Sequence, residues 1–97
     1  MSEIDLDKTV ATDNQDRKRY ELALGEEVAV VEYILAKGMI VFTHTEVPQA
    51  YAGKGVANRL IRFALDDARA QGLSVHPLCP IVAAFIRRHP EYQDLVA

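Results

Sequence analysis

The first half of the chain alternates hydrophobic and polar residues with the period of β-strands. The segments 17–24, 27–38 and 39–47 are rich in Val, Ile, Leu and Tyr, a composition typical of strands. Gly25-Glu26 and Lys37-Gly38 mark the turns between them, and each pair is short enough for a hairpin. The pattern therefore predicts an antiparallel meander of three strands.

From Val56 onward the hydrophobic positions follow the 3.6-residue period of an α-helix. Arg62 and Asp66 occupy the opposite, polar face at pairing distance. Gly72 is the expected stop at the carboxyl end. The apolar stripe consists of Ala57, Leu60, Ile61, Ala64, Leu65 and Ala68.

Two shorter elements complete the pattern. Residues 73–78 indicate a strand and residues 80–89 a second helix, with Pro80 suited to its first turn and Pro90 as its stop. The predicted order is β-β-β-α-β-α, an α+β fold with a mixed sheet. The strand 39–47, the first helix and the next strand form a right-handed parallel crossover. Ligands bind at the carboxyl ends of such strands.

Composition places the chain among ordinary single domains. It has 97 residues, of which 49% are hydrophobic and 26% charged, and this length suits one compact core. No apolar run approaches the ~20 residues that span a bilayer, so no membrane partner is predicted. The single cysteine, Cys79, excludes an internal disulfide and indicates a reducing, cytoplasmic compartment.

The net charge of −3 is concentrated at the amino end. Residues 1–16 hold five acidic residues and one lysine, a charge of −4, which leaves +1 for residues 17–97. We interpret residues 1–16 as an acidic, disordered leader and residues 17–97 as the folded domain. A nearly neutral domain does not indicate nucleic-acid binding, which requires a basic face.

The stretch VPQAYAGKGVANRL, residues 47–60, places two of the five glycines directly before the first helix. It does not match a Walker loop, because Gly55 follows Lys54 where Ser or Thr is required. Nor does it match a dinucleotide fingerprint, because Asn58 stands at the last glycine position. Two interpretations remain. The turn exposes consecutive amides at a helix N-terminus and binds an anion, or it uses glycine only for positive φ.

This stretch resembles the acyl-CoA pyrophosphate loop of the GNAT superfamily of N-acetyltransferases, whose pattern is Arg/Gln-x-x-Gly-x-Gly/Ala. Gly55 and Ala57 fill the two small positions, and Ala52 replaces the usual Arg or Gln. The resemblance implies that CoA or acetyl-CoA binds here, with one side-chain contact to phosphate lost. The cofactor-binding residues that it implies are Val47, Gly53, Lys54, Gly55, Val56, Ala57 and Asn58.

Two further segments, FTHTEVP and HPLCPIVAAFIRRHPEYQDL, look like a short single-domain branch of the same superfamily. The resemblance covers about residues 17–96. It implies an abbreviated GNAT-like fold in which two central parallel strands splay apart and admit the pantetheine arm. It also implies that the N-terminal helices of larger relatives, which often shape the acceptor pocket, are missing.

Cys79 is predicted at the start of the second helix, where the helix dipole favours a thiolate. An isolated cysteine is equally often a small buried hydrophobe. The resemblance implies an active-site group near the CoA thiol. It would act as a covalent acyl carrier or as the proton donor to the departing thiolate.

His44 and Glu46 lie two residues apart on one strand and therefore share a face. Either could take the proton from an attacking amine. The alternatives are a histidine hydrogen-bonded within the sheet and a carboxylate that accepts hydrogen bonds from loop amides. Tyr92 is a further candidate, as a phenolic acid. The three histidines lack the close spacing of a metal site, so no metal is predicted.

Three functions are compatible with these residues. The first is an acetyl-CoA-dependent N-acyltransferase that acts on an unidentified amine, either a small molecule or a protein. The second is a CoA-binding sensor or adaptor with little or no catalysis, which the short chain and Ala52 favour. The third is a protein-interaction domain in which the glycine loop is only a turn.

Overall fold

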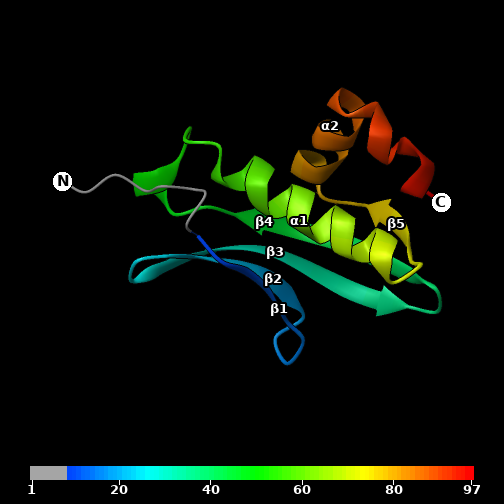
Figure 1. The fold of residues 1–97 in the computed structure, drawn as a ribbon, viewed down its shortest axis with the longest axis horizontal. Coiled ribbons are helices and arrows are strands. Elements are labelled where there is room, and N and C mark those ends of the chain that lie inside the picture. The colour runs from blue at the N-terminus through cyan, green and yellow to red at the C-terminus, as the bar shows by residue number, and fades with distance from the viewer. Residues whose placement is uncertain (1–8) are drawn as a thin grey trace.

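The computed structural model describes residues 9–97, which form a mixed β-sheet covered by helices (Figure 1). The predicted α+β class, the antiparallel meander and the parallel crossover are confirmed. In chain order the elements are β1 (Ala11–Asn14), β2 (Arg19–Leu24), β3 (Glu27–Ala36), β4 (Met39–Glu46), η2 (Gln49–Tyr51), α1 (Val56–Ala70), β5 (Ser74–Pro77), α2 (Pro80–Arg88) and η3 (Pro90–Leu95).

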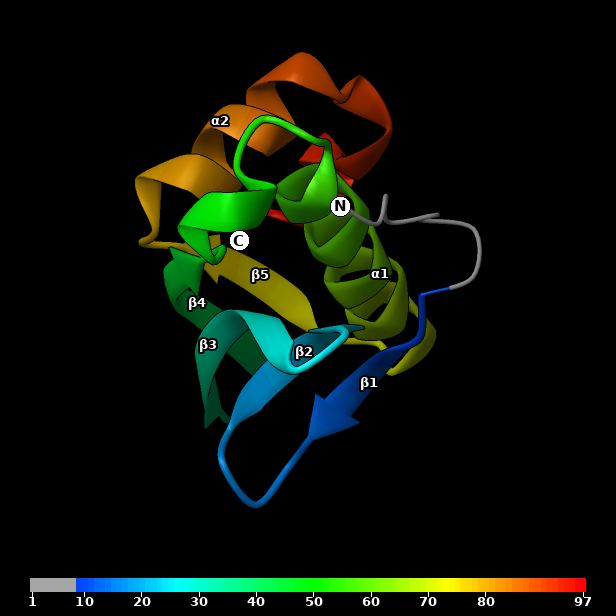
Figure 2. The same cartoon turned by 90° about the vertical axis from the view of Figure 1, so that its left-hand side faces the viewer.

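The strands follow one another across the sheet in the order β1-β2-β3-β4-β5. Neighbours pair antiparallel up to β4, and β4 pairs with β5 in parallel through the α1 crossover. Both helices pack over one face (Figure 2), and within residues 9–97 the other face carries no helix. The carboxyl end covers the edge of β5, because the Ala97 N–H donates to the Val75 carbonyl at 3.1 Å.

The interpretation of residues 1–16 as a disordered leader is wrong for residues 11–14. These four residues form β1, which pairs along its whole length with β2. The Tyr33 hydroxyl also donates a hydrogen bond of 2.6 Å to Asp13. A polar edge strand is ordered by pairing and by such bonds rather than by an apolar face, so its composition resembles that of a leader. Residues 1–8 of the predicted leader lie outside the described residues.

The hydrophobic core lies between the sheet and the two helices. The stripe predicted on α1 is buried, except that Val56 takes the place of Ala57, which is only partly buried. Each fully buried aliphatic side chain of this kind contributes about 1.5–3 kcal/mol to folding. The largest fully buried side chains are those of Tyr20, Phe42, Phe85, Leu22, Leu24, Ile40, Leu60, Ile61 and Leu65.

Two tyrosines add polar ties to this core. The Tyr20 hydroxyl donates to Asp67 of α1 at 2.6 Å, and its ring packs on that of Tyr33 with 5.3 Å between centroids. Burial, followed by the hydrogen bond to Asp67, raises the pKa of Tyr20. Burial, followed by the bond to Asp13, raises the pKa of Tyr33. Both phenols therefore remain protonated donors, and Tyr20 joins the sheet to α1 while Tyr33 joins β3 to β1.

Candidate functional site

A β-bulge near the end of β4 decides which face its polar residues occupy. Phe42 lies opposite Tyr33 of β3, yet the adjacent partner pair joins His44 to Glu32. Thr43 is therefore the extra residue of the bulge, and its hydroxyl donates to the Glu32 carbonyl at 3.3 Å. The insertion of one residue reverses the faces of the residues that follow.

Beyond the bulge, alternate residues of β4 exchange sides. Ile40 and Phe42 point into the core before it, and Thr45 is the buried residue after it. His44 and Glu46 consequently lie on the helix-free face, where His44 Nε2 and a Glu46 carboxylate oxygen are 3.5 Å apart. The structure thus agrees with the prediction that His44 and Glu46 share a face, and the bulge determines which face it is.

The pairing between β4 and β5 stops before β4 itself ends. Its last partners are Phe42 and Pro77, and Pro77 has no N–H with which to extend the ladder. The Cys79 N–H donates to the Phe42 carbonyl at 2.9 Å, after which the chain turns into α2. β4 meanwhile continues through Thr43–Glu46. The two parallel strands therefore part at their carboxyl ends, as the GNAT resemblance implies.

Cys79 stands at the N-cap of α2, where the sequence places it. The residue is buried, with 3% of its surface exposed, and its Sγ lies 3.4 Å from Thr45 Oγ1. Because Thr45 faces the core, this thiol lies on the helix side of the sheet. The three predicted catalytic residues are therefore not brought together: His44 and Glu46 form a pair on one side of β4, and Cys79 lies on the other.

The glycine loop enters α1 through two left-handed residues. Gly53 has φ 75°, and Gly55, the N-cap of α1, has φ 81°. Residues that carry a side chain rarely adopt these backbone angles, which explains why glycine occupies both positions. The Arg59 N–H donates the first helical bond to the Gly55 carbonyl at 3.1 Å. The N–H groups of residues 56–58 precede that bond and are the ones a helix N-terminus presents to an anion.

A hollow of about 320 Å³ opens beside these N–H groups. Six of the seven predicted cofactor-binding residues border it, and Lys54 is exposed outside it. Tyr51 and Ala52, which the sequence did not mark as binding residues, also border it. An aromatic residue just before a glycine loop is the signal that could have identified Tyr51. The bordering residues are Val47, Tyr51, Ala52, Gly53, Gly55, Val56, Ala57 and Asn58.

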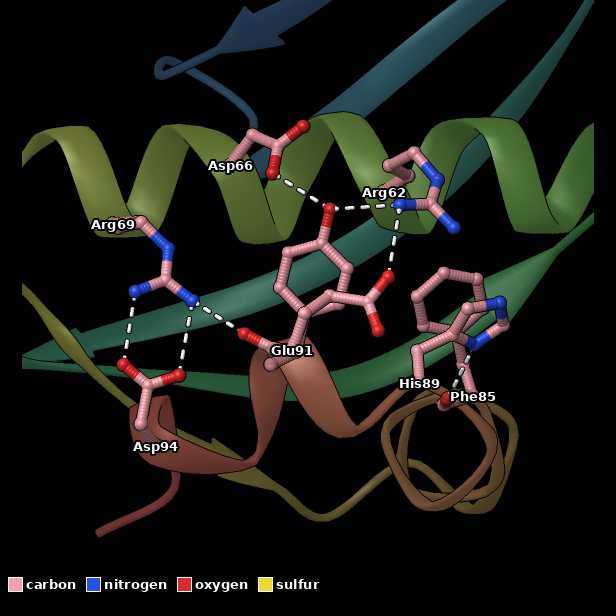
Figure 3. Close-up of polar contacts among 8 residues, drawn as sticks. Arg62, Asp66, Arg69, Phe85, His89, Glu91 and Asp94 are labelled. Atoms are coloured by element: carbon pink, nitrogen blue, oxygen red, sulfur yellow. Dashed lines mark hydrogen bonds and ion pairs between the residues drawn. The ribbon is translucent and has the colours of Figure 1, made fainter.

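The residues of the C-terminal motif HPEY make packing contacts and hydrogen bonds with α1 (Figure 3). Tyr92 is buried, and its hydroxyl donates to Asp66 at 2.7 Å and accepts a hydrogen bond from Arg62 at 3.1 Å. Burial, followed by the bond to Asp66, raises the pKa of Tyr92. A phenol held in this way is a structural donor, so these contacts favour packing over an acid role for Tyr92.

Further contacts hold the C-terminal segment against the two helices. Arg69 donates two hydrogen bonds to the carboxylate of Asp94, at 2.9 and 3.0 Å, and one of 2.7 Å to the Glu91 carbonyl. The rings of His89 and Phe85 stack with 3.9 Å between centroids. These contacts hold η3 against α1 and α2, and His89 is the C-cap of α2, directly before the predicted stop at Pro90.

No group of three or more His, Cys, Asp or Glu side chains among residues 9–97 is placed to hold a metal ion. In the same range no helix is long and apolar enough to cross a bilayer.

Curated relatives share most of the chain. Protein NATD1 of Gallus gallus is 33% identical over 86 residues, which cover 82% of this chain and 77% of that protein. Protein NATD1 of Mus musculus is 30% identical over 86 residues, which cover 84% of this chain and 77% of that protein. NATD1 of Bos taurus is 37% identical over 68 residues, or 70% of this chain and 59% of that protein.

A solved structure shares the fold. The NMR structure of a GCN5-like protein from Staphylococcus aureus matches with a TM-score of 0.67 over 82% of this chain and 81% of that one. Its sequence identity is 22%, so this likeness concerns the fold alone. The family model described as GCN5-related N-acetyl-transferase matches residues 19–95. Because that match spans most of the chain, the protein belongs to the family of GCN5-related N-acetyltransferases.

Proposed function

We propose that this protein is an N-acyltransferase that uses acetyl-CoA as the donor and an amine as the acceptor. Membership of the family supports acyl transfer in general. The observation that carries the acetyl-CoA assignment is the hollow at the start of α1, which Val47 borders directly after β4. The anionic head group of CoA would occupy the hollow, and its thin pantetheine arm would run from there between the parting strands.

The glycine loop would bind the pyrophosphate of CoA. The N–H groups of residues 56–58 and the positive end of the α1 dipole stabilise an anion at this point. Asn58 borders the hollow and can donate from its side-chain amide, while Lys54 adds positive charge from the exposed side of the loop. Ala52 offers no side-chain donor, so affinity would rest mainly on the backbone.

The bulged end of β4 would hold the thioester. Residues Thr43–Glu46 continue past the last β4–β5 pair, so a backbone N–H on that side can donate to the thioester carbonyl. Such a donor stabilises the negative charge that develops on the carbonyl oxygen. On the helix-free face, His44 would take the proton of the attacking amine, and Glu46 would stabilise the charged imidazole.

Cys79 would act from the opposite side of the strand. Its Sγ–H can give a proton to the departing CoA sulfur. A covalent route, in which the same sulfur first accepts the acyl group, is the alternative. An acyl group on Cys79 would lie on the helix side of the sheet, away from His44 and Glu46. This separation of base and thiol favours direct transfer.

Turnover measurements test this proposal. The purified protein is incubated with acetyl-CoA and a panel of amines, and CoA release is followed together with the mass of the acylated product. We expect binding of acetyl-CoA by calorimetry and turnover of at least one amine, reduced in Cys79→Ala. Mass spectrometry after exposure to acetyl-CoA alone would reveal an acetyl group on Cys79 if the covalent route operates. Absence of binding at millimolar acetyl-CoA would refute the proposal.

Two observations favour a second candidate, a CoA-binding module without catalysis. Ala52 borders the hollow where the family pattern has Arg or Gln, and the thiol of Cys79 is buried. Tight CoA binding without product from any amine would support this candidate.

A further inference from the structure

Among residues 9–97, Thr45 is the one buried residue with an aliphatic hydroxyl, and 6% of its surface is exposed. Burial of a hydroxyl costs free energy unless it is hydrogen-bonded. Valine has nearly the same shape without this cost, and Val31 is in fact the cross-strand partner of Thr45. Packing alone therefore does not explain a threonine at this position, and its hydroxyl needs a separate reason.

The partner of this hydroxyl is the Cys79 thiol, at 3.4 Å between Oγ1 and Sγ. The contact joins β4 to the N-cap of α2, immediately beyond the last β4–β5 pair. The bulge at Thr43 turns Thr45 inward, since without it His44 would occupy the core side. The bulge, the end of the pairing and the start of α2 thus combine to set one hydroxyl against one thiol.

We propose that Thr45 is a positioning residue that orients the Cys79 thiol and stabilises its ionised form by donating a hydrogen bond. This inference rests on the proposed function, in which Cys79 is the proton donor. With a protonated thiol, either atom can be the donor. Once the sulfur is ionised, only the Thr45 hydroxyl can donate, and hydrogen bonds to charged groups are the stronger ones.

Every proton of the acyl-transfer step has a source and a destination. As the thioester C–S bond breaks, its electron pair remains on the CoA sulfur, which takes the proton from Cys79 Sγ. The Cys79 thiolate accepts the hydrogen bond from Thr45 and regains a proton from water. The proton of the amine has already passed to His44, which releases it to solvent. Thr45 itself is neither ionised nor acylated.

The first test uses the fact that Cys79 is the single cysteine. The rate of its alkylation by iodoacetamide is measured at pH 8 in the full chain. We expect Thr45→Val to lower this rate about tenfold, the size expected for one hydrogen bond to an ionised group, and Thr45→Ser to retain it. Thr12→Val makes the same chemical change at an exposed position of β1 and is the control.

The second test compares steady-state acyl transfer in the same variants. Thr45→Val should lower kcat about tenfold and leave KM for acetyl-CoA unchanged, and Thr45→Ser should restore kcat. Equal or faster alkylation of Cys79 in Thr45→Val, or failure of Thr45→Ser to restore the rate, would overturn the inference. Alkylation requires no turnover, so a failure of the proposed function would be seen separately, as wild-type protein that neither binds nor consumes acetyl-CoA.

Discussion

The two ends of α1 both carry polar motifs, but their surroundings differ. Toward the carboxyl end, Arg62, Asp66 and Arg69 are engaged with the C-terminal segment through the hydroxyl of Tyr92 and the carboxylate of Asp94. At the amino end, a hollow of about 320 Å³ adjoins the first N–H groups of the helix, whereas the hollow of about 430 Å³ beside Arg62 and Asp66 borders side chains that already have partners. Polar groups that satisfy one another stabilise a fold, whereas helix N–H groups that face a hollow are suited to a ligand.

This contrast separates motifs that the sequence alone ranks equally as candidate sites. HTEVP, the glycine loop and HPEY all resemble motifs of the same family branch. The structure assigns the last of these to packing, because Tyr92 is buried and bonded on both sides of its hydroxyl. Substitutions at the amino end of α1 and in β4 should therefore change activity, and substitutions near η3 should change stability.

The largest effect is expected for His44→Ala. Removal of a general base typically costs about 10²–10⁴-fold in rate, so kcat should fall at least about a hundredfold. The melting temperature should barely change, because the side chain is exposed. His76→Ala is the matched control, since it removes a histidine that lies on β5 but on the same face of the sheet as His44. Equal losses of kcat in both variants would refute a specific role for His44.

A smaller effect, on affinity, is expected for Gly55→Val. A β-branched residue at φ 81° is strained by about 1–3 kcal/mol, and relief of that strain would move the N–H groups at the start of α1. We expect the affinity for CoA to fall at least about tenfold by calorimetry. Gly38→Val imposes similar strain at φ 70° in the β3–β4 turn. Both variants should melt earlier, but loss of affinity in Gly38→Val as well would remove the distinction.

The predicted effect of Tyr92→Phe is on stability alone. Loss of the hydroxyl leaves Asp66 without this donor, which should lower the free energy of unfolding by about 1–2 kcal/mol. Urea denaturation measures this change. Affinity for CoA should stay the same, and a drop in affinity larger than the measurement error would show that the two ends of α1 are not independent.

The smallest effect concerns the exposed pair of Arg69 and Asp94. The hydrogen bond from Arg69 lowers the pKa of Asp94 below its usual value of 3.8. A carboxylate with a lowered pKa in the folded state contributes stability above the pKa of the unfolded state and loses it as pH falls through the folded value. Arg69→Ala should therefore melt slightly earlier than the wild type at pH 7, and the part of the difference that comes from Asp94 should be lost as pH falls from about 3.8 through the lowered pKa of Asp94. A difference that is as large at about pH 2 as at pH 7 would contradict this assignment.

Most of the fold could be predicted because periodicity is a local property. The two-residue and 3.6-residue patterns marked β2 to β5 and both helices, and glycine or proline marked their ends. β1 was not predicted from the sequence, because its segment is largely polar and is held in place by pairing with β2 and by the hydrogen bond from Tyr33 to Asp13. Sequence composition cannot distinguish such an edge strand from a leader.

The candidate site was predictable only in part, for a related reason. The glycine loop is contiguous, so six of its predicted residues do border one hollow. The bulge at Thr43 depends on the register with β3, and it decides the face of His44 and Glu46. Thr45 meets Cys79 across 34 positions of sequence. A contact of that kind follows from the assembled sheet rather than from any local motif.

We propose above all that CoA binds at the amino end of α1 and enters between the parting strands. An NMR titration of ¹⁵N-labelled protein with CoA tests it most directly. We predict saturable shifts in the amides of residues 53–58 and 43–46 and in Cys79, with the amides of residues 89–95 unmoved. No shifts at millimolar CoA, or shifts centred on η3, would contradict the account.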